Sequence, residues 1–284
     1  MPLAHLIDRA VLCISGEDAA NFLAGLVTCA VPEANEARFG ALLTPQGKII
    51  SDFFLLRVSG AEPLFLVDAP KLTAGTLLKR FSMYKLRAKL TIADHSAEKA
   101  VFAAWGGALA PAGSASFVEP RYVEMGLRLF GAAPSTQSCD ASLADYDAHR
   151  IRLAIPQGGR DFAYGDAFPH EAAMDQLAGV DFQKGCYVGQ EVVSRMQHRG
   201  TARTRIAGLR FSGAAPLEGA ELKAGEKALG RVGSVDAPAG RAIGLLRLDR
   251  LEEALAAKAE LRADDVILRA EKPVWARYDF PIAA

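Results

Sequence analysis

Residues 39–58 constrain the fold most, because they have the pattern of a β-hairpin. A Thr-Pro-Gln-Gly turn occupies residues 44–47, where Pro45 fixes φ at a value that turns use and Gly47 can adopt a positive φ. The second arm, residues 49–58, is apolar at nearly every position, a pattern typical of a strand covered on both faces. The sequence therefore predicts a buried sheet early in the chain.

The elements around this hairpin do not alternate strand with helix. We expect further strands at residues 9–15, 64–67, 90–93, 101–105 and 123–130, and helices at residues 16–26, 71–84, 142–154 and 189–199. Ser15 is expected to cap the first helix, and Asp140 or Ser142 the third. Strands that follow strands are typical of an α+β fold rather than of a doubly wound sheet.

Two predicted loops and a change in the sequence pattern near Arg203 divide the rest of the chain. Residues 108–116 predict a loop, and the Gly-rich residues 157–170 predict a candidate site loop. From about Arg203 onward, glycines separate short β-like runs at residues 206–211, 229–235, 242–248 and 266–270. This pattern predicts a small, separate β-barrel. A chain of 284 residues suits two or three domains.

The charge balance and the N-terminal residues exclude several protein classes. Lys plus Arg and Asp plus Glu are 33 each, which argues against a protein devoted to coating nucleic acid or anionic membrane. Charged residues interrupt the first apolar stretch, so no secretory signal is expected, and no stretch approaches the roughly 20 apolar residues of a membrane span. A cytoplasmic location follows by default.

The four cysteines, Cys13, Cys29, Cys139 and Cys186, form no C-x-x-C pair, and the histidines show no metal-ligand spacing. We therefore expect reduced thiols and no metal site. Cys186 differs from the others because it lies two residues after Lys184 and just before a predicted helix, both of which favour a thiolate. Gly185 and Gly189 are expected to permit tight backbone geometry around it. The alternative is a structural turn with a buried thiol.

Five short segments carry a resemblance to a known family. They are K-G-C-Y-x-G-Q-E at residues 184–191, R-I-R-L-A-I-P at 150–156, F-P-H-E at 168–171, L-T-P-Q-G-K at 43–48 followed by Asp52, and K-L-R-A-K at 85–89. Together they span most of the chain and resemble the YgfZ-type folate-binding proteins, which are related to the glycine-cleavage T-protein and include iron–sulfur cluster assembly factors. The first segment is the most specific of the five.

The resemblance implies two interleaved α+β domains around a central cavity, followed by a C-terminal barrel. The first domain would comprise residues 1–37 and 120–202, the second residues 38–119, and the barrel residues 203–284. It also implies that tetrahydrofolate or a one-carbon derivative binds in the cavity.

The residues expected to hold the folate follow from the same resemblance. Glu171 matches the pterin-binding Glu of the T-protein, and one carboxylate can accept both N–H groups of a pterin edge. Tyr146 matches an aromatic that stacks on the pterin, although simple core packing is the alternative. Arg9 falls at the near edge of the expected pocket, where relatives can carry an aromatic. Tyr187, in the first motif, and Arg195 complete the expected folate contacts.

Three functions stay open at this point. In the first, the chain is an accessory factor that binds folate and uses Cys186, assisted by Lys184, in iron–sulfur cluster assembly or repair with client or assembly proteins. In the second, it is an aminomethyl transferase with Asp52 as the catalytic carboxylate; the first acid of the T-protein pair is replaced by Ser51.

The third is a tRNA-modification factor. It would bind RNA phosphates through a basic cluster comprising Arg195, His198, Arg199, Arg203 and Arg205. The same cluster could hold the glutamate tail of folate, or could be a solvated helix end.

Overall fold

The computed structural model describes residues 2–107, 115–133, 138–200 and 202–281. The loop expected at residues 108–116 therefore lies largely outside the described residues. The chain forms two compact units, one made of Met1–Tyr146 with Leu177–Ser194 and the other of Asp147–Gln176 with Arg195–Ala284. Each unit is built from segments that are distant in sequence.

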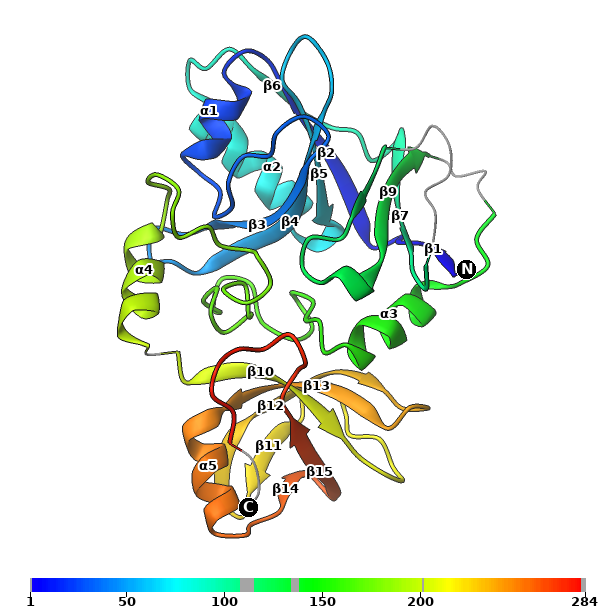
Figure 1. The fold of residues 1–284 in the computed structure, drawn as a ribbon, viewed down its shortest axis with the longest axis vertical. Helices are drawn as coiled ribbons and strands as arrows, with labels where there is room; N and C mark the ends of the chain where they lie inside the picture. Colours follow the sequence, from blue (N-terminus) through cyan, green and yellow to red (C-terminus); the bar gives the residue numbers. More distant parts are fainter. Residues whose placement is uncertain (1, 108–114, 134–137, 201, 282–284) are drawn as a thin grey trace. The chain divides into compact units, whose positions relative to one another are not determined.

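A five-stranded antiparallel sheet is the centre of the first unit (Figure 1). Its strands, in spatial order, are β3 (Ala37–Leu43), β4 (Ile49–Val58), β5 (Leu64–Pro70), β2 (Arg9–Ser15) and β6 (Thr91–Asp94). The helix α2 (Lys71–Lys85) contributes fully buried Leu77 and Phe81 to the core that contains Phe53 and Leu55 of β4. Burial of these apolar side chains drives the packing of α2 on the sheet.

A second, four-stranded sheet completes the first unit. It comprises β1 (Leu3–His5), β7 (Lys99–Ala104), β9 (Leu127–Ala132) and β8 (Ala115–Val118), in that order. The N-terminal strand β1 pairs with β7, about 100 residues away along the chain. A short helix α1 (Ala19–Ala24) and a 3-10 turn, η1 (Val123–Met125), lie in the connections of this unit.

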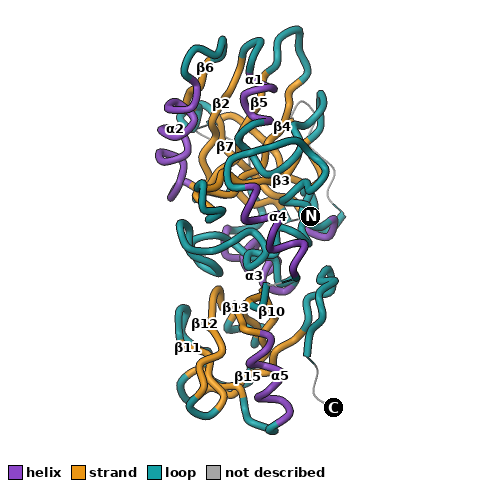
Figure 2. The backbone as a smooth tube through the Cα atoms, turned by 90° about the vertical axis from the view of Figure 1, so that its left-hand side faces the viewer, coloured by secondary structure: helices purple, strands orange, loops and turns teal. Residues whose placement is uncertain are grey.

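The second unit contains a closed antiparallel barrel. Its strands are β10 (Thr204–Arg210), β13 (Arg241–Arg247), β12 (Lys227–Asp236), β11 (Glu221–Ala224), β14 (Leu261–Ala263) and β15 (Val266–Glu271). The helix α5 (Leu248–Ala256) follows β13 directly and packs buried Leu251 and Ala254 against the barrel core. The segment between α3 (Leu143–Arg152) and α4 (Gln190–Arg199) is loop and turn (Figure 2).

The predicted fold class is confirmed, since the structure has mixed helix and sheet with a C-terminal β-barrel. The hairpin forms with the expected turn, and Gly47 has φ +80°. The third helix begins as expected, because the amide of Asp145 donates to the Ser142 hydroxyl at 3.2 Å while the amide of Ser142 donates to the Asp145 carboxylate at 2.8 Å. The three domain boundaries and the central cavity stay predictions.

Several elements differ from the prediction for local reasons. The first helix covers only Ala19–Ala24, because Gly16 has φ +128° and Ser15 still belongs to β2. The strand expected at residues 123–130 starts only at Leu127, since Gly126 adopts φ +86° after a 3-10 turn. Among the described residues, no helix is long and apolar enough to span a membrane.

Candidate functional site

The segment that leads into the first motif is pinned to the start of the hairpin by Thr28. The Thr28 hydroxyl donates to the Gly179 carbonyl at 2.6 Å and accepts from the Ala41 amide at 2.8 Å. The amide of Asp181 donates to the Thr28 carbonyl at 2.9 Å. Thr28 is fully buried, so these bonds are shielded from water and fix where the motif begins.

Lys184, expected beside the reactive thiol, is engaged elsewhere in the same unit. Its Nζ donates to the carbonyls of Ala24 at 2.9 Å and Val27 at 2.5 Å, at the end of α1. Burial lowers the pKa of Lys184, with Cys29 and Asp181 opposing the shift. The structure thus gives Lys184 an anchoring role at the turn after α1.

Tyr187 packs its ring against this lysine, with Lys184 Nζ 5.0 Å from the ring centroid. The tyrosine is buried, and burial followed by the Asp181 charge raises its pKa to about 12. Tyr187 therefore stays protonated at physiological pH. Tyr187 is the buried residue of the motif, and Lys184 is half-buried beside it.

The two motif glycines have different roles. Gly189 has φ +85°, and a Cβ atom there would lie 2.6 Å from the Thr44 carbonyl oxygen, in the turn of the hairpin. A Cβ on Gly47 would likewise come within 3.0 Å of Val192 Cβ. Gly185 has no atom within 4 Å of such a Cβ, so its expected steric role is wrong. Of the two motif glycines, Gly189 is therefore the one that lets the motif pack on the hairpin.

Replacement of Gly189 by Ala should therefore lower the melting temperature by several degrees, equivalent to about 1–3 kcal/mol for the strained φ, and more if the close contact is not relieved. Thermal unfolding followed by circular dichroism measures this. Gly185→Ala is the matched control and should melt within about 0.5 kcal/mol of wild type. Equal melting temperatures for the two variants would contradict the assignment.

Cys186 is the exposed cysteine of the four, whereas Cys29 is buried and Cys13 and Cys139 are partly buried. It lies four residues before α4 begins at Gln190, and this helix starts one residue later than expected. The alternative of a buried thiol is excluded. Burial raises the pKa of Cys29 to about 12, which leaves that thiol protonated. Among the four, Cys186 is the thiol most accessible to a partner or a cluster.

A buried network of charged side chains joins the two sheets of the first unit. The Arg128 guanidinium donates to Asp68 at 2.6 Å, to Glu119 at 3.2 Å and to the Tyr146 hydroxyl at 2.7 Å. Arg9 also binds Asp68, with Nε 2.5 Å from Oδ1. Arg9 and Tyr146, which the sequence predicted as site residues, are thus linked through Asp68 and Arg128.

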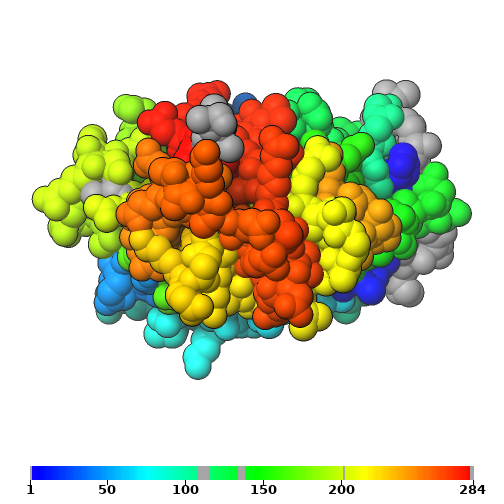
Figure 3. Space-filling model, turned by 90° about the horizontal axis from the view of Figure 1, so that it is seen from below, coloured from blue at the N-terminus to red at the C-terminus, as the bar shows by residue number. Residues whose placement is uncertain are grey.

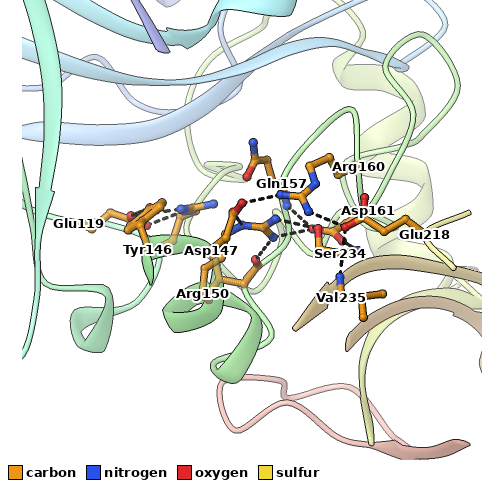
Figure 4. Close-up of polar contacts among 12 residues, drawn as sticks. Glu119, Tyr146, Asp147, Arg150, Gln157, Arg160, Asp161, Glu218, Ser234 and Val235 are labelled. Atoms are coloured by element: carbon orange, nitrogen blue, oxygen red, sulfur yellow. Dashed lines mark hydrogen bonds and ion pairs between the residues drawn. The ribbon is translucent and has the colours of Figure 1, made fainter. Parts of the chain in front are cut away.

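Arg121 completes this network through Glu119. Its Nε lies 2.5 Å and its Nη2 3.1 Å from the two carboxylate oxygens of Glu119, a bidentate pair. The Tyr146 hydroxyl lies 3.2 Å from the same carboxylate, and Figure 4 shows the two side chains together. Burial would raise the pKa of Glu119, but Arg121 and Arg128 outweigh burial and hold it below the usual range.

The network lies on one face of the five-stranded sheet. Phe54 pairs with Asp68, and the Arg128 guanidinium stacks 4.1 Å from the Phe54 ring centroid. Asp52 is two residues before Phe54 on the same strand, so it points to the same face. Ser51 instead bonds Thr73 of α2 at 2.6 Å. The expected catalytic carboxylate therefore shares its face with the arginines and is buried.

Sequence reasoning missed Asp68, Glu119, Arg121 and Arg128. Each is a charged residue in or beside a strand, and Asp68 and Arg128 interrupt otherwise apolar runs. A charge within such a run is a signal, because it is buried only when it is paired. Its partners, however, lie about 60 residues away along the chain.

Glu171 belongs to the second unit and is half-buried. Its Oε2 accepts a hydrogen bond from the Phe168 amide at 2.9 Å, which fixes the F-P-H-E turn. Arg205 of β10 holds the same turn, since its Nη1 donates to the His170 carbonyl at 2.8 Å and to the Asp175 carboxylate at 2.9 Å. Within its unit, the carboxylate of Glu171 is therefore placed by a well-anchored turn.

A second buried cluster fixes the loop that precedes this turn (Figure 4). Arg150 is 1% exposed and donates to Asp147 at 2.7 Å, to Asp161 at 2.9 Å and to the Ser234 hydroxyl at 2.7 Å. Asp161 in turn accepts from the backbone amides of Gln157 and Ser234, each at 2.7 Å. Arg150, the first residue of the R-I-R-L-A-I-P segment, thus connects this loop to β12 of the barrel.

One member of the predicted basic cluster is not available at the surface. Arg205 is buried. Its guanidinium forms an ion pair with Asp175 and lies 4.8 Å from the ring centroid of Tyr278. Arg203 is exposed and lies 3.7 Å from Asp249. Arg195 is exposed on α4. Fewer cations are therefore available for phosphate than the sequence suggested.

One hollow of the second unit is lined by none of the predicted site residues. It has a volume of about 550 Å³ and is lined mainly by apolar side chains of α5, β14 and β15, together with Phe280. Figure 3 shows the surface of the barrel in a view from below. None of the site residues expected from the sequence lines it, so we do not assign the folate to it. No group of three or more His, Cys, Asp or Glu side chains in the described segments could hold a metal ion.

Comparison with known proteins gives consistent matches. The model of the CAF17 C-terminal beta-barrel domain matches residues 203–278. The mitochondrial iron-sulfur cluster assembly factor IBA57 of Homo sapiens is 32% identical over 242 residues, covering 76% of this chain and 68% of the human protein. The mitochondrial IBA57 homologue of Neurospora crassa is 34% identical over 242 residues, covering 75% and 55% respectively. This chain thus spans little more than half of the fungal protein.

The fold has a solved counterpart. The crystal structure of the glycine cleavage system aminomethyltransferase T from Bartonella henselae matches with a TM-score of 0.74 and 17% identity, covering 99% of this chain and 87% of that chain. The prediction of a T-protein-like fold is therefore confirmed. The prediction of a cytoplasmic location is wrong, because these IBA57 relatives are named as mitochondrial proteins. That prediction rested only on the lack of a recognised signal, which does not distinguish compartments.

Proposed function

Because this chain belongs to the family of the iron–sulfur cluster assembly factor IBA57, we propose that it is an accessory factor in iron–sulfur cluster assembly that binds a reduced folate. One observation carries the proposal: the 32% identity to the human factor extends over 68% of that protein. The exposed thiol of Cys186 supports it, because a cluster or a client can reach this residue. Cluster-dependent enzymes should lose activity when the chain is removed from its host.

The T-protein-like fold supports folate as the ligand, and Glu171 fits a pterin. An ionised carboxylate offers about four lone-pair positions, and the Phe168 amide uses one of them. The rest suffice for the two N–H groups at the pterin edge. Bound tetrahydrofolate would supply a carrier for one-carbon units, while Glu171 would orient it.

The two tyrosines fit a folate less directly. Tyr146 has its hydroxyl bound to Arg128 and its ring 5.9 Å from Trp105, and Tyr187 carries Lys184 on its ring. Both would shape the walls of a site rather than present a free stacking face. Arg9 and Arg195 stay predicted folate contacts.

Titration of tetrahydrofolate into the purified chain, followed by calorimetry, tests the folate part of this proposal. Wild type should bind, and Glu171→Gln should weaken binding about tenfold or more, because the isosteric amide puts a donor against the pterin N–H groups. Glu62→Gln, at an exposed surface position, should bind as wild type does. Equal affinities for Glu171→Gln and wild type would remove Glu171 from the site.

A folate-dependent aminomethyl transferase is the second candidate function. The buried position of Asp52, on the sheet face that carries the arginine network, favours it, since a poised carboxylate is what the transfer step requires. Turnover of an aminomethyl donor that is lost in Asp52→Asn but kept in Cys186→Ser would identify a transferase. No turnover with wild type would eliminate this candidate.

A further inference from the structure

The outward side of α2 concentrates positive charge on an otherwise balanced protein. Residues 71–90 contain six Lys or Arg and no Asp or Glu, whereas the whole chain has 33 of each sign. The helix lies on the outside of the five-stranded sheet (Figure 2), and its inner side is fixed by buried Leu77 and Phe81. The exposed Lys79 and Arg80 therefore lie away from the packed side of α2.

Large apolar side chains are exposed on this helix and just after it. Leu72 is 75% exposed, Met83 58% and Leu86 87%. At about 100° per residue, Leu72, Lys79 and Met83 fall within an arc of about 40° on α2. Leu86 follows the helix with φ +45°, a conformation that a leucine rarely adopts. Single exposed apolar residues are common, but three within a segment of 15 residues, beside unpaired cations, suit a partner surface.

Five of the six basic side chains divide into two groups. Lys71 donates to the Ile7 carbonyl, and Lys89 pairs with Glu17 at 2.9 Å, so both serve the fold. In the part of the chain that the structure describes, the side chains of Lys79, Arg80 and Arg87 make no hydrogen bond or ion pair. Their charges are available to an external group.

We propose that this α2 outer face, comprising Leu72, Lys79, Arg80, Met83, Leu86 and Arg87, docks an acidic amphipathic segment of a partner protein. Apolar side chains of the segment would cover Leu72, Met83 and Leu86. Its carboxylates would pair with the cations between and beside them, an arrangement that adds specificity and speeds association. The face is about 21 Å long from Leu72 to Leu86. A partner helix of about four turns has the length to cover it.

Two other occupants are less compatible with these side chains. A nucleic acid would use the cations but would leave three apolar side chains against its phosphates. An anionic membrane would require a continuous apolar side that can enter the interface, whereas the most apolar side of α2 packs on the sheet. The mixture of separated apolar and basic residues suits a protein segment best.

Photocrosslinking in the host cell tests the proposal with the full chain. Met83 is replaced by the photoreactive amino acid benzoylphenylalanine, and the crosslinked peptides are sequenced by mass spectrometry. The same amino acid at Leu217, an exposed apolar position of the second unit, is the site control. Circular dichroism establishes that each variant is folded.

We expect a protein crosslink at position 83 that maps to an acidic segment with interspersed apolar residues. The triple variant Lys79→Glu, Arg80→Glu and Arg87→Glu should reduce its yield at least tenfold. An equal reversal of charge in the second unit, Arg231→Glu, Lys258→Glu and Arg269→Glu, should leave it unchanged. A crosslink to lipid or nucleic acid, to a neutral or basic segment, or at the same yield in both triple variants would overturn the proposal, as would the lack of any crosslink above the Leu217 control.

Discussion

Glu119→Gln is expected to lower the free energy of unfolding by about 3–5 kcal/mol, because it removes the carboxylate that two buried guanidinium groups share. Glu119 is 2% exposed and contacts Arg121, Arg128 and the Tyr146 hydroxyl. Glutamine keeps the shape but presents N–H donors to groups that are themselves donors. The loss would be a large share of the roughly 5–15 kcal/mol that stabilises a typical domain.

Denaturant titration of the full chain measures this effect. Glu62→Gln, which removes the same charge from the surface, should change the unfolding free energy by less than about 0.5 kcal/mol. Adding Arg121→Met to Glu119→Gln should cost less than the sum of the single changes, with a coupling of about 0.5–3 kcal/mol. A Glu119→Gln variant as stable as Glu62→Gln would show that the network does not support the fold.

The same carboxylate predicts a pH dependence. Its pKa in the folded chain is lowered, so its contribution to stability is complete above the ordinary value of about 4.5 and is lost as pH falls through the lower folded value. Wild type should therefore lose more stability on acidification below about pH 4.5 than Glu119→Gln does. If wild type and Glu119→Gln lost the same unfolding free energy on acidification, the lowered pKa of Glu119 would be contradicted.

Cys186→Ser is expected to abolish the support of iron–sulfur enzymes while leaving the fold intact. Cys186 is exposed and no buried packing depends on it, so the melting temperature should stay within about 1 °C of wild type. In cells that lack the chain, the variant should restore at most about a tenth of the activity that wild type restores to a hydratase-type iron–sulfur enzyme. A loss of activity without a loss of stability separates a chemical role from a structural one.

Cys139→Ser is the matched control, because it removes a thiol of the same unit that lies outside the motif. It should restore activity as wild type does, at equal protein abundance on immunoblots. Full restoration by Cys186→Ser would exclude the thiol from the function and leave folate binding as the remaining chemical role.

The fold could be predicted from local signals where those signals are strong. The hairpin follows from its turn residues and α4 from its amphipathic pattern, and both form close to the expected bounds. The strands β11 and β14 have four and three residues, too few to show an alternation. The helix α5 was missed because it follows β13 without a loop or a turn residue.

The site was predictable only in part, since its geometry depends on long-range pairing. The motif identified Cys186, and the turn around Glu171 forms as a unit. Lys184 was expected to activate the thiol, but its contacts to Ala24 and Val27, about 160 residues away in sequence, depend on the tertiary fold. The buried partners of Arg9 and Tyr146 come from three different strands or loops, which no local pattern reveals.

Incorporation of radioactive iron into a client protein tests the central claim most directly. Host cells with and without the gene are labelled with iron-55, and one enzyme that contains an iron–sulfur cluster is immunoprecipitated and counted. Incorporation per molecule of this enzyme should fall several-fold without the chain and recover when wild type is supplied. Unchanged incorporation in cells that lack the chain would contradict a role in cluster assembly.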